Sequence, residues 1–155
     1  PLALRIAEAL RAARPDLVVT HAYEGGHPDH DAVACAVRAA LRLAPGAELA
    51  EMTGYHAGPD GIVVGRFLPS AEPVLTFPLG AEAALERRML DCFATQRAVL
   101  ADFPPGEERL RAAPPADFAR PPHDGQLFYE RFPWGMDGAR FRAVARAALD
   151  GLGLP

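Results

Sequence analysis

The sequence contains no lysine, and all 16 of its basic residues are arginine. We attribute this bias to coding preference and draw no function from it. Acidic residues outnumber basic ones by 20 to 16, and the formal net charge is −4. This charge balance is unsuited to binding nucleic acid or an anionic membrane surface, so we expect neither as a partner.

Cysteine is scarce, and long apolar runs are absent. The two cysteines, Cys35 and Cys92, fall within helical patterns, which predicts buried, reduced side chains rather than a disulfide. The sequence has no secretory signal and no apolar run of about 18 residues. We therefore predict a cytoplasmic protein, and the sequence carries no signal for an oligomeric state.

Half of the residues are hydrophobic, which is typical of a globular chain with a real core. Helical and extended patterns alternate over the first third of the chain: helix 2–13, strand 17–20, helix 32–43 and strand 48–53. This order predicts an α/β, Rossmann-like layered fold with a mainly parallel sheet. No linker or repeat divides the chain, so we expect one domain over residues 1–155.

The remaining patterns are less regular. Residues 62–67 and 73–77 are predicted to form a pair of short antiparallel strands at an edge, followed by a long helix over 81–103 and an irregular proline-rich segment. Residues 127–132 suit a short strand or a packed flap, Trp134 suits the core, and 138–149 suit a closing helix.

A glycine turn between strand 17–20 and helix 32–43 carries the densest group of ionisable side chains. It contains Gly25 and Gly26, then His27, Asp29 and His30. In open α/β sheets, ligands bind beyond the carboxyl end of a strand, which is where this turn lies. Glycine at position 26 permits close backbone approach to a ligand.

Local helix chemistry predicts how these side chains are arranged. Pro28 suits the first helical position, so His27 is expected at the N-cap and His30 one turn further on. Residues three apart lie on the same side of a helix, so both imidazoles can face one spot. Tyr23, earlier in the same loop, is a candidate hydrogen-bond donor to a reacting carbonyl.

The stretch Gly26-His27-Pro28-Asp29-His30 resembles the second signature of the PIG-L/LmbE-like zinc deacetylases. Glu86 to Phe103, with Gln96 near its centre, resembles a late helix of that family, and Phe128 to Phe132 resembles the segment before its end. The family's first signature, His-Pro-Asp-Asp-Glu, is absent from this sequence. We therefore expect the C-terminal portion of such a domain, with its sheet incomplete on the N-terminal side.

The resemblance implies the zinc-dependent removal of an N-acetyl or other N-acyl group from an amino sugar or glycoconjugate. It assigns His30 as a zinc ligand, His27 as the residue that stabilises or protonates the reacting centre, and Asp29 as its orienting partner. Catalytic zinc usually has three protein ligands. The family takes its other two ligands and its general base from the first signature, so this portion alone is expected to be inactive.

Two alternatives remain open at the level of sequence. The chain could be a non-catalytic descendant that binds a sugar-like ligand without turnover. It could also be another metal-dependent hydrolase, such as a phosphoesterase, with further ligands drawn from His21, Asp31, His56 and His123.

Overall fold

A computed structural model describes residues 2–155 as a mixed α/β structure. Its first elements are α1 (Leu2–Ala13), β1 (Leu17–His21), α2 (Pro28–Leu43) and β2 (Glu48–Met52). The predictions for these four elements are confirmed, because their apolar spacing and the proline at the start of α2 are local signals. Within residues 2–155, no helix is both long enough and apolar enough to cross a bilayer.

The larger sheet has four strands in the order β1-β2-β6-β5, with β5 at Val74–Phe77 and β6 at Glu108–Ala112. Strands β1 and β2 are parallel, whereas β6 is antiparallel to both β2 and β5. The prediction of a mainly parallel sheet is therefore wrong. Parallel neighbours need a crossover connection, and in the described sheet α2 supplies that connection between β1 and β2.

A buried ion-pair group explains why β6 lies beside β2. Glu51 of β2 is 1% exposed. Its carboxylate oxygens form ion pairs with a guanidinium nitrogen of Arg38 on α2 at 2.8 Å and with one of Arg111 on β6 at 2.7 Å. Arg111 and Glu51 are also register partners in the two strands. The three charges join the helix layer to the middle of the sheet, through partners distant in sequence.

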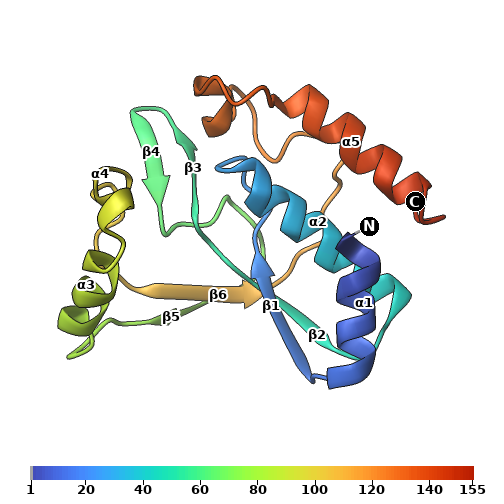
Figure 1. Ribbon diagram of the computed structural model, residues 1–155, viewed down its shortest axis with the longest axis horizontal. Helices are drawn as coiled ribbons and strands as arrows, with labels where there is room; N and C mark the ends of the chain where they lie inside the picture. The colour runs from blue at the N-terminus through green and yellow to red at the C-terminus, as the bar shows by residue number, and fades with distance from the viewer. Residues whose placement is uncertain (1) are drawn as a thin grey trace.

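The smaller sheet is a hairpin of β3 (Tyr55–Gly58) and β4 (Gly61–Val64). The predicted pairing of residues 62–67 with 73–77 is wrong, because β4 pairs with β3 and β5 pairs with β6. The hairpin rises beside the N-terminal end of α2 (Figure 1). Tyr55, the first residue of β3, lies next to the glycine turn, since a Cβ at Gly26 would lie 1.9 Å from the Tyr55 carbonyl oxygen.

The core lies between α2 and α5 (Gly138–Asp150), which run side by side above the sheet (Figure 1). It contains Ala34 and Cys35 of α2, Phe141 and Ala145 of α5, and Phe118 from the irregular segment. Both cysteines are free, as predicted. Cys92 is exposed, however, so its predicted burial is wrong.

Residues 74–103 form the far end of the molecule from α1 (Figure 1). The single helix predicted over 81–103 is broken into α3 (Ala83–Asp91), the 3-10 turn η1 (Ala94–Gln96) and α4 (Arg97–Leu100). The break occurs at Phe93, whose φ of −88° and ψ of 60° are not helical. Residues 128–131 form a second 3-10 turn, η2 (Phe128–Arg131), rather than a strand.

Candidate functional site

His27 caps the N-terminus of α2, as predicted. Its Nδ1 accepts a hydrogen bond from the backbone N–H of Asp29 at 3.1 Å. A backbone N–H can only donate, so Nδ1 carries no proton in this bond and the ring proton lies on Nε2. The Asp29 carboxylate lies 3.9 Å from the same Nδ1 and is 88% exposed. The helix start thus contributes a hydrogen bond that fixes the His27 ring, alongside the acid predicted to orient it.

The glycine pair is required by the shape of the turn. Gly25 has a φ of +72°, in the left-handed region that favours glycine. A Cβ at Gly26 would lie 1.9 Å from the carbonyl oxygen of Tyr55. The close approach seen at Gly26 is therefore to the β3 backbone, and a contact between Gly26 and a substrate stays a prediction.

Two buried carboxylates hold this turn. Asp31 is 0% exposed, and its Oδ1 accepts the backbone N–H groups of Glu24 at 3.2 Å and Gly25 at 3.1 Å. Glu24 accepts the Gly54 N–H at 3.0 Å and the Thr53 hydroxyl at 3.1 Å. The ends of β1 and β2 are thereby fixed to each other through side chains.

Burial shifts the protonation of both acids. It raises the pKa of Asp31 to about 7 and that of Glu24 to about 7. The hydrogen bonds to each carboxylate favour its charged form and lower the pKa, but their effect is smaller than that of burial. Sequence reasoning missed Glu24, although an acid placed directly before Gly-Gly at a strand end is the available signal. Asp31 is a buried anchor of the turn.

His30 lies at the centre of a group of aromatic and imidazole rings. Its ring centroid is 5.4 Å from that of His27, 4.2 Å from that of His21 and 5.7 Å from that of Tyr55. The His21 and His30 rings are parallel within 3°. The predicted spacing of one helical turn therefore brings His27 and His30 together.

His30 has the electrostatic state of a metal ligand. Burial, and then the neighbouring His21 and His27, lower the pKa of His30 to about 4. Burial also lowers the pKa of His21. At neutral pH the His30 imidazole is uncharged, which is the form that binds metals. Gly54 lies beside this ring, and a Cβ there would be in van der Waals contact with it, 3.5 Å from its Nδ1.

Trp134 lies at the edge of this group rather than in the core. It is 48% exposed and stacks on Phe132 at 4.6 Å with an interplanar angle of 11°. Its centroid is 5.0 Å from that of His27. The prediction of a core tryptophan is wrong, because the chain after η2 passes over the end of α2.

Tyr23 lies away from the two imidazoles. Its ring packs on Phe118 at 4.7 Å and Phe141 at 5.8 Å, and its hydroxyl donates to the carbonyl oxygen of Arg120 at 2.9 Å. Burial raises the Tyr23 pKa, so the hydroxyl keeps its proton. A substrate contact from Tyr23 stays a prediction, and the structure gives this hydroxyl a different partner.

The other histidines do not join the site. His56 is buried, and its two ring nitrogens lie 2.9 Å and 3.1 Å from the carbonyl oxygens of Ala57 and Arg66. His123 lies 2.7 Å from the Asp124 carbonyl oxygen and 6.1 Å, ring to ring, from His56. Asp31 is engaged with the turn backbone. Of the four further ligands considered for a phosphoesterase, only His21 lies beside His30.

The fit of these residues to zinc is partial. His30 supplies the donor type that zinc binds, a neutral imidazole. Among residues 2–155, however, no three His, Cys, Asp or Glu side chains are grouped so that they could hold a metal ion. The described residues thus do not supply three zinc ligands, and the role of His30 as a ligand stays a prediction.

Comparison with known proteins bears on the turn and the helices around it. No curated protein and no solved structure matches the chain. One family model matches, described as GlcNAc-PI de-N-acetylase (PIG-L), over residues 1–41. This stretch contains α1, β1, the glycine turn, His27 and His30, and the match suggests a hydrolase of the deacetylase type. The resemblance to the PIG-L family is thus confirmed over residues 1–41, the part of the chain that carries the candidate site.

Proposed function

We propose that this chain forms part of a zinc-dependent N-deacylase that hydrolyses the amide of an N-acylated amino sugar. The observation that carries the proposal is the pair His27 and His30, whose ring centroids lie 5.4 Å apart at the end of β1. Both residues lie within the segment that matches the PIG-L family model. Two adjacent imidazoles beyond a strand end suit the binding and hydrolysis of a small ligand.

His30 would hold the metal, together with ligands that residues 2–155 do not supply. A bound zinc ion would provide a water of lowered pKa and polarise the amide carbonyl. The low pKa of His30 keeps its imidazole available for a metal throughout the neutral range. His21 stacks on the His30 ring and limits how that ring can turn.

His27 would act on the reacting amide itself. Hydrolysis forms a bond between the water oxygen and the carbonyl carbon, breaks the C–N bond and delivers a proton to the leaving nitrogen. With Nδ1 accepting the Asp29 N–H, the Nε2–H of the neutral His27 ring would donate a hydrogen bond to the oxyanion. Protonation of the leaving amine would need the His27 imidazolium, whose Nδ1–H would pair with the Asp29 carboxylate 3.9 Å away. The helix cap therefore selects the ring nitrogen that performs the chemistry.

The test is metal analysis combined with an N-acetylglucosaminide deacetylation assay on the natural full-length product. We expect stoichiometric zinc in the parent protein and loss of both zinc and activity in His30→Ala. His27→Ala should keep zinc but lose about 10²- to 10⁴-fold in kcat, the range of a lost general acid. His123→Ala, outside the ring group, is the matched control and should retain both.

Three outcomes would contradict parts of the proposal. Stoichiometric zinc in His30→Ala would remove His30 as a ligand. Unchanged kcat in His27→Ala would remove its role in proton transfer. Sugar binding by a zinc-free parent without turnover would favour the non-catalytic alternative.

A further inference from the structure

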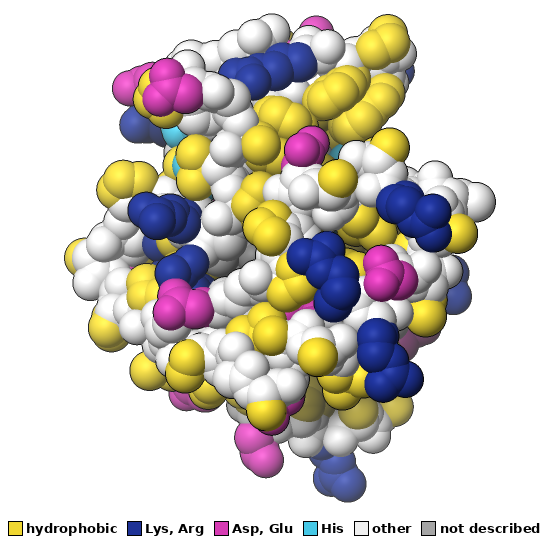
Figure 2. Space-filling model, turned by 90° about the vertical axis from the view of Figure 1, so that its left-hand side faces the viewer, with side chains coloured by type: hydrophobic (Ala, Val, Ile, Leu, Met, Phe, Trp, Pro, Cys, Tyr) yellow, Lys and Arg dark blue, Asp and Glu magenta, His cyan; other side chains and the backbone are white. Residues whose placement is uncertain are grey.

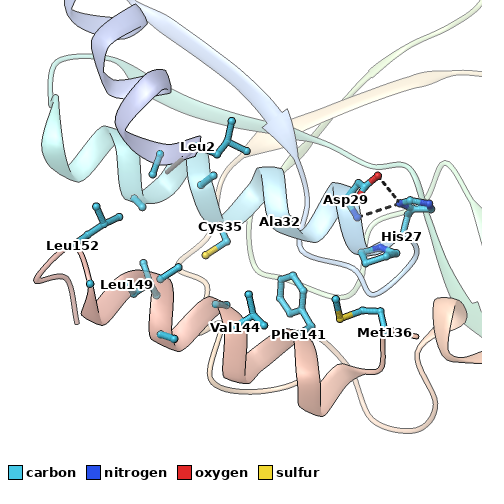
Figure 3. A pocket seen from close by; sticks show the side chains of 18 of the residues that line it. Leu2, His27, Asp29, Ala32, Cys35, Met136, Phe141, Val144, Leu149 and Leu152 are labelled. Atoms are coloured by element: carbon cyan, nitrogen blue, oxygen red, sulfur yellow. Dashed lines mark hydrogen bonds and ion pairs between the residues drawn. The ribbon is translucent and has the colours of Figure 1, made fainter. Parts of the chain in front are cut away.

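A groove of about 820 Å³ starts at the candidate site and runs between α1, α2 and α5. His27 and Asp29 form one end of it, and Leu149 and Leu152 lie towards the other (Figure 3). Its volume lies within the range of small-molecule sites in proteins. The groove therefore extends the site in a defined direction, away from the sheet and along the helices.

The walls of the groove are almost entirely apolar. Beyond the His27 end, they are lined mainly by small or aliphatic side chains, including Ala32, Ala36, Val144 and Ala148. Asp29 is the one charged side chain among the lining residues, and it lies at the mouth. A sugar or a charged peptide placed along these walls would lose hydrogen bonds to water without replacement. The groove suits an apolar guest whose polar end lies at His27.

The shape of the groove suits an elongated guest. Pro28 and Ala39, both in its lining, are eleven residues apart on α2, which corresponds to roughly 16 Å along the helix axis. The lining alanines of α2 and α5 have short side chains, so the groove stays open between the two helices along this length. Several lining side chains are left exposed, including Leu2 at 51% and Val144 at 57%. An unbranched chain lying there would cover them.

We propose that this groove binds the acyl chain of the substrate, so that the amide cleaved is that of a medium-chain N-acyl amino sugar. The inference rests on the proposed function, because it places the scissile carbonyl at His27. The acyl chain begins at that carbonyl and continues into the apolar groove, whereas the sugar hydroxyls remain on the open side of the site. Trp134 lines the groove and lies beside His27, so it covers the junction between the amide and the chain.

The first experiment measures binding in the absence of turnover, with octanamide and acetamide as probes. Octanamide should bind the parent protein far more tightly than acetamide does, since each buried methylene contributes about fourfold in affinity. Ala148→Phe should fill part of the groove and weaken octanamide binding about tenfold or more. Ala143→Phe is the matched control, because Ala143 is exposed on the same helix and does not line the groove.

The second experiment measures kcat/KM for N-octanoyl- and N-acetylglucosamine with the natural full-length product. The parent should prefer the N-octanoyl substrate, Ala148→Phe should reduce that preference, and Ala143→Phe should preserve it. Equal kcat/KM for the two substrates, with no octanamide binding, would overturn the groove assignment and leave the proposed function intact. Octanamide binding blocked by Ala148→Phe, without hydrolysis of either substrate, would overturn the proposed function and leave an acyl-chain site.

A third measurement separates a ligand from a second protein chain. If the groove were occupied by another copy of this chain, the parent would sediment as a dimer and Ala148→Phe as a monomer. That result, with no octanamide binding, would overturn the proposal. An unchanged sedimentation coefficient together with octanamide binding supports it.

Discussion

Two regions of this molecule have similar amphipathic sequences and very different environments. In the first, which we call the helical layer (α1, α2 and α5), apolar positions recur every three or four residues, and each helix buries part of its apolar face. Helix α2 alone buries Ala34, Cys35, Val37, Ala39 and Ala40. In the second, the distal segment (residues 74–103), the same spacing produces α3 and α4, and neither helix has a buried residue.

The difference lies in what each region packs against. Helix α2 contacts α1 and β1, and α5 lies on its outer side (Figure 1). Leu85, Met89, Phe93 and Val99 of the distal segment are each more than half exposed, and apolar side chains are spread over the face seen from that side (Figure 2). Periodicity therefore identifies the apolar side of a helix, but burial also needs a partner surface. The candidate site and the groove both belong to the region that has one.

Replacing one glycine in the turn that leads into α2 and one in the distal segment should give the largest contrast. Gly26→Ala forces a Cβ to 1.9 Å from the Tyr55 carbonyl oxygen, a backbone clash that no rotamer relieves. We expect a loss of more than about 4 kcal/mol in the free energy of unfolding. At Gly80 the nearest group is the mobile end of Glu82 at 3.5 Å, so Gly80→Ala should change stability by less than about 1 kcal/mol. Urea unfolding measures both; equal losses would show that the turn is not rigid.

Removing one phenylalanine in each region tests packing directly. Phe141 is 5% exposed, whereas Phe93 is 58% exposed. Phe141→Ala should cost about 3–5 kcal/mol, because it removes a ring packed on Tyr23 and leaves a cavity. Phe93→Ala should cost less than about 1 kcal/mol. Thermal unfolding followed by circular dichroism compares them, and a larger loss for Phe93→Ala would mean that the distal segment is covered in solution.

Two aspartates on helices provide a third, smaller contrast. Asp31→Ala on α2 leaves the buried N–H groups of Glu24 and Gly25 without an acceptor, which should cost about 2–3 kcal/mol. Asp91→Ala at the end of α3 alters an exposed side chain and should change stability by less than about 0.5 kcal/mol. Denaturant unfolding of both variants at one pH is the measurement. Similar values would show that Asp31 does not hold the turn.

The same contrast explains which parts of the fold could be predicted from sequence. The bounds of α1, the proline at the start of α2 and the N-cap at His27 depend on neighbours within a few residues, and these predictions are confirmed. The pairing of His27 with His30 follows from helical geometry alone. Strand β6 was missed because its place beside β2 depends on Arg111 reaching Glu51, 60 positions away.

The positions of three side chains in the site could not be predicted either, because each depends on a contact with another part of the chain. Asp31 is adjacent to a predicted metal ligand, but its actual partners are backbone groups on the preceding turn. Glu24 depends on Thr53 and Gly54, which follow β2. Tyr23 was predicted near the substrate, yet its ring packs on Phe118 and Phe141. Each of these placements is set by a contact between separate elements, which sequence spacing does not encode.

The pH dependence of stability gives the finest test of this buried network. Burial raises the pKa of Glu24 from 4.5 to about 7. Between these values the folded state binds more protons than the unfolded state, so stability falls as the pH rises through this window. Glu24→Gln cannot ionise, yet it can still accept the Gly54 N–H and donate to the Thr53 hydroxyl. The difference between the two curves reports the titration of Glu24 together with its electrostatic coupling to Asp31.

We expect the free energy of unfolding of the parent to fall by about 3 kcal/mol more than that of Glu24→Gln between about pH 4.5 and about pH 7.5. Urea titrations at intervals across this range provide the two curves. Because the Gln variant loses the cost of burying a charge, it should gain stability relative to the parent as the pH rises. Parallel curves would mean that Glu24 is hydrated in solution, and the link between the ends of β1 and β2 would then be looser than its hydrogen bonds indicate.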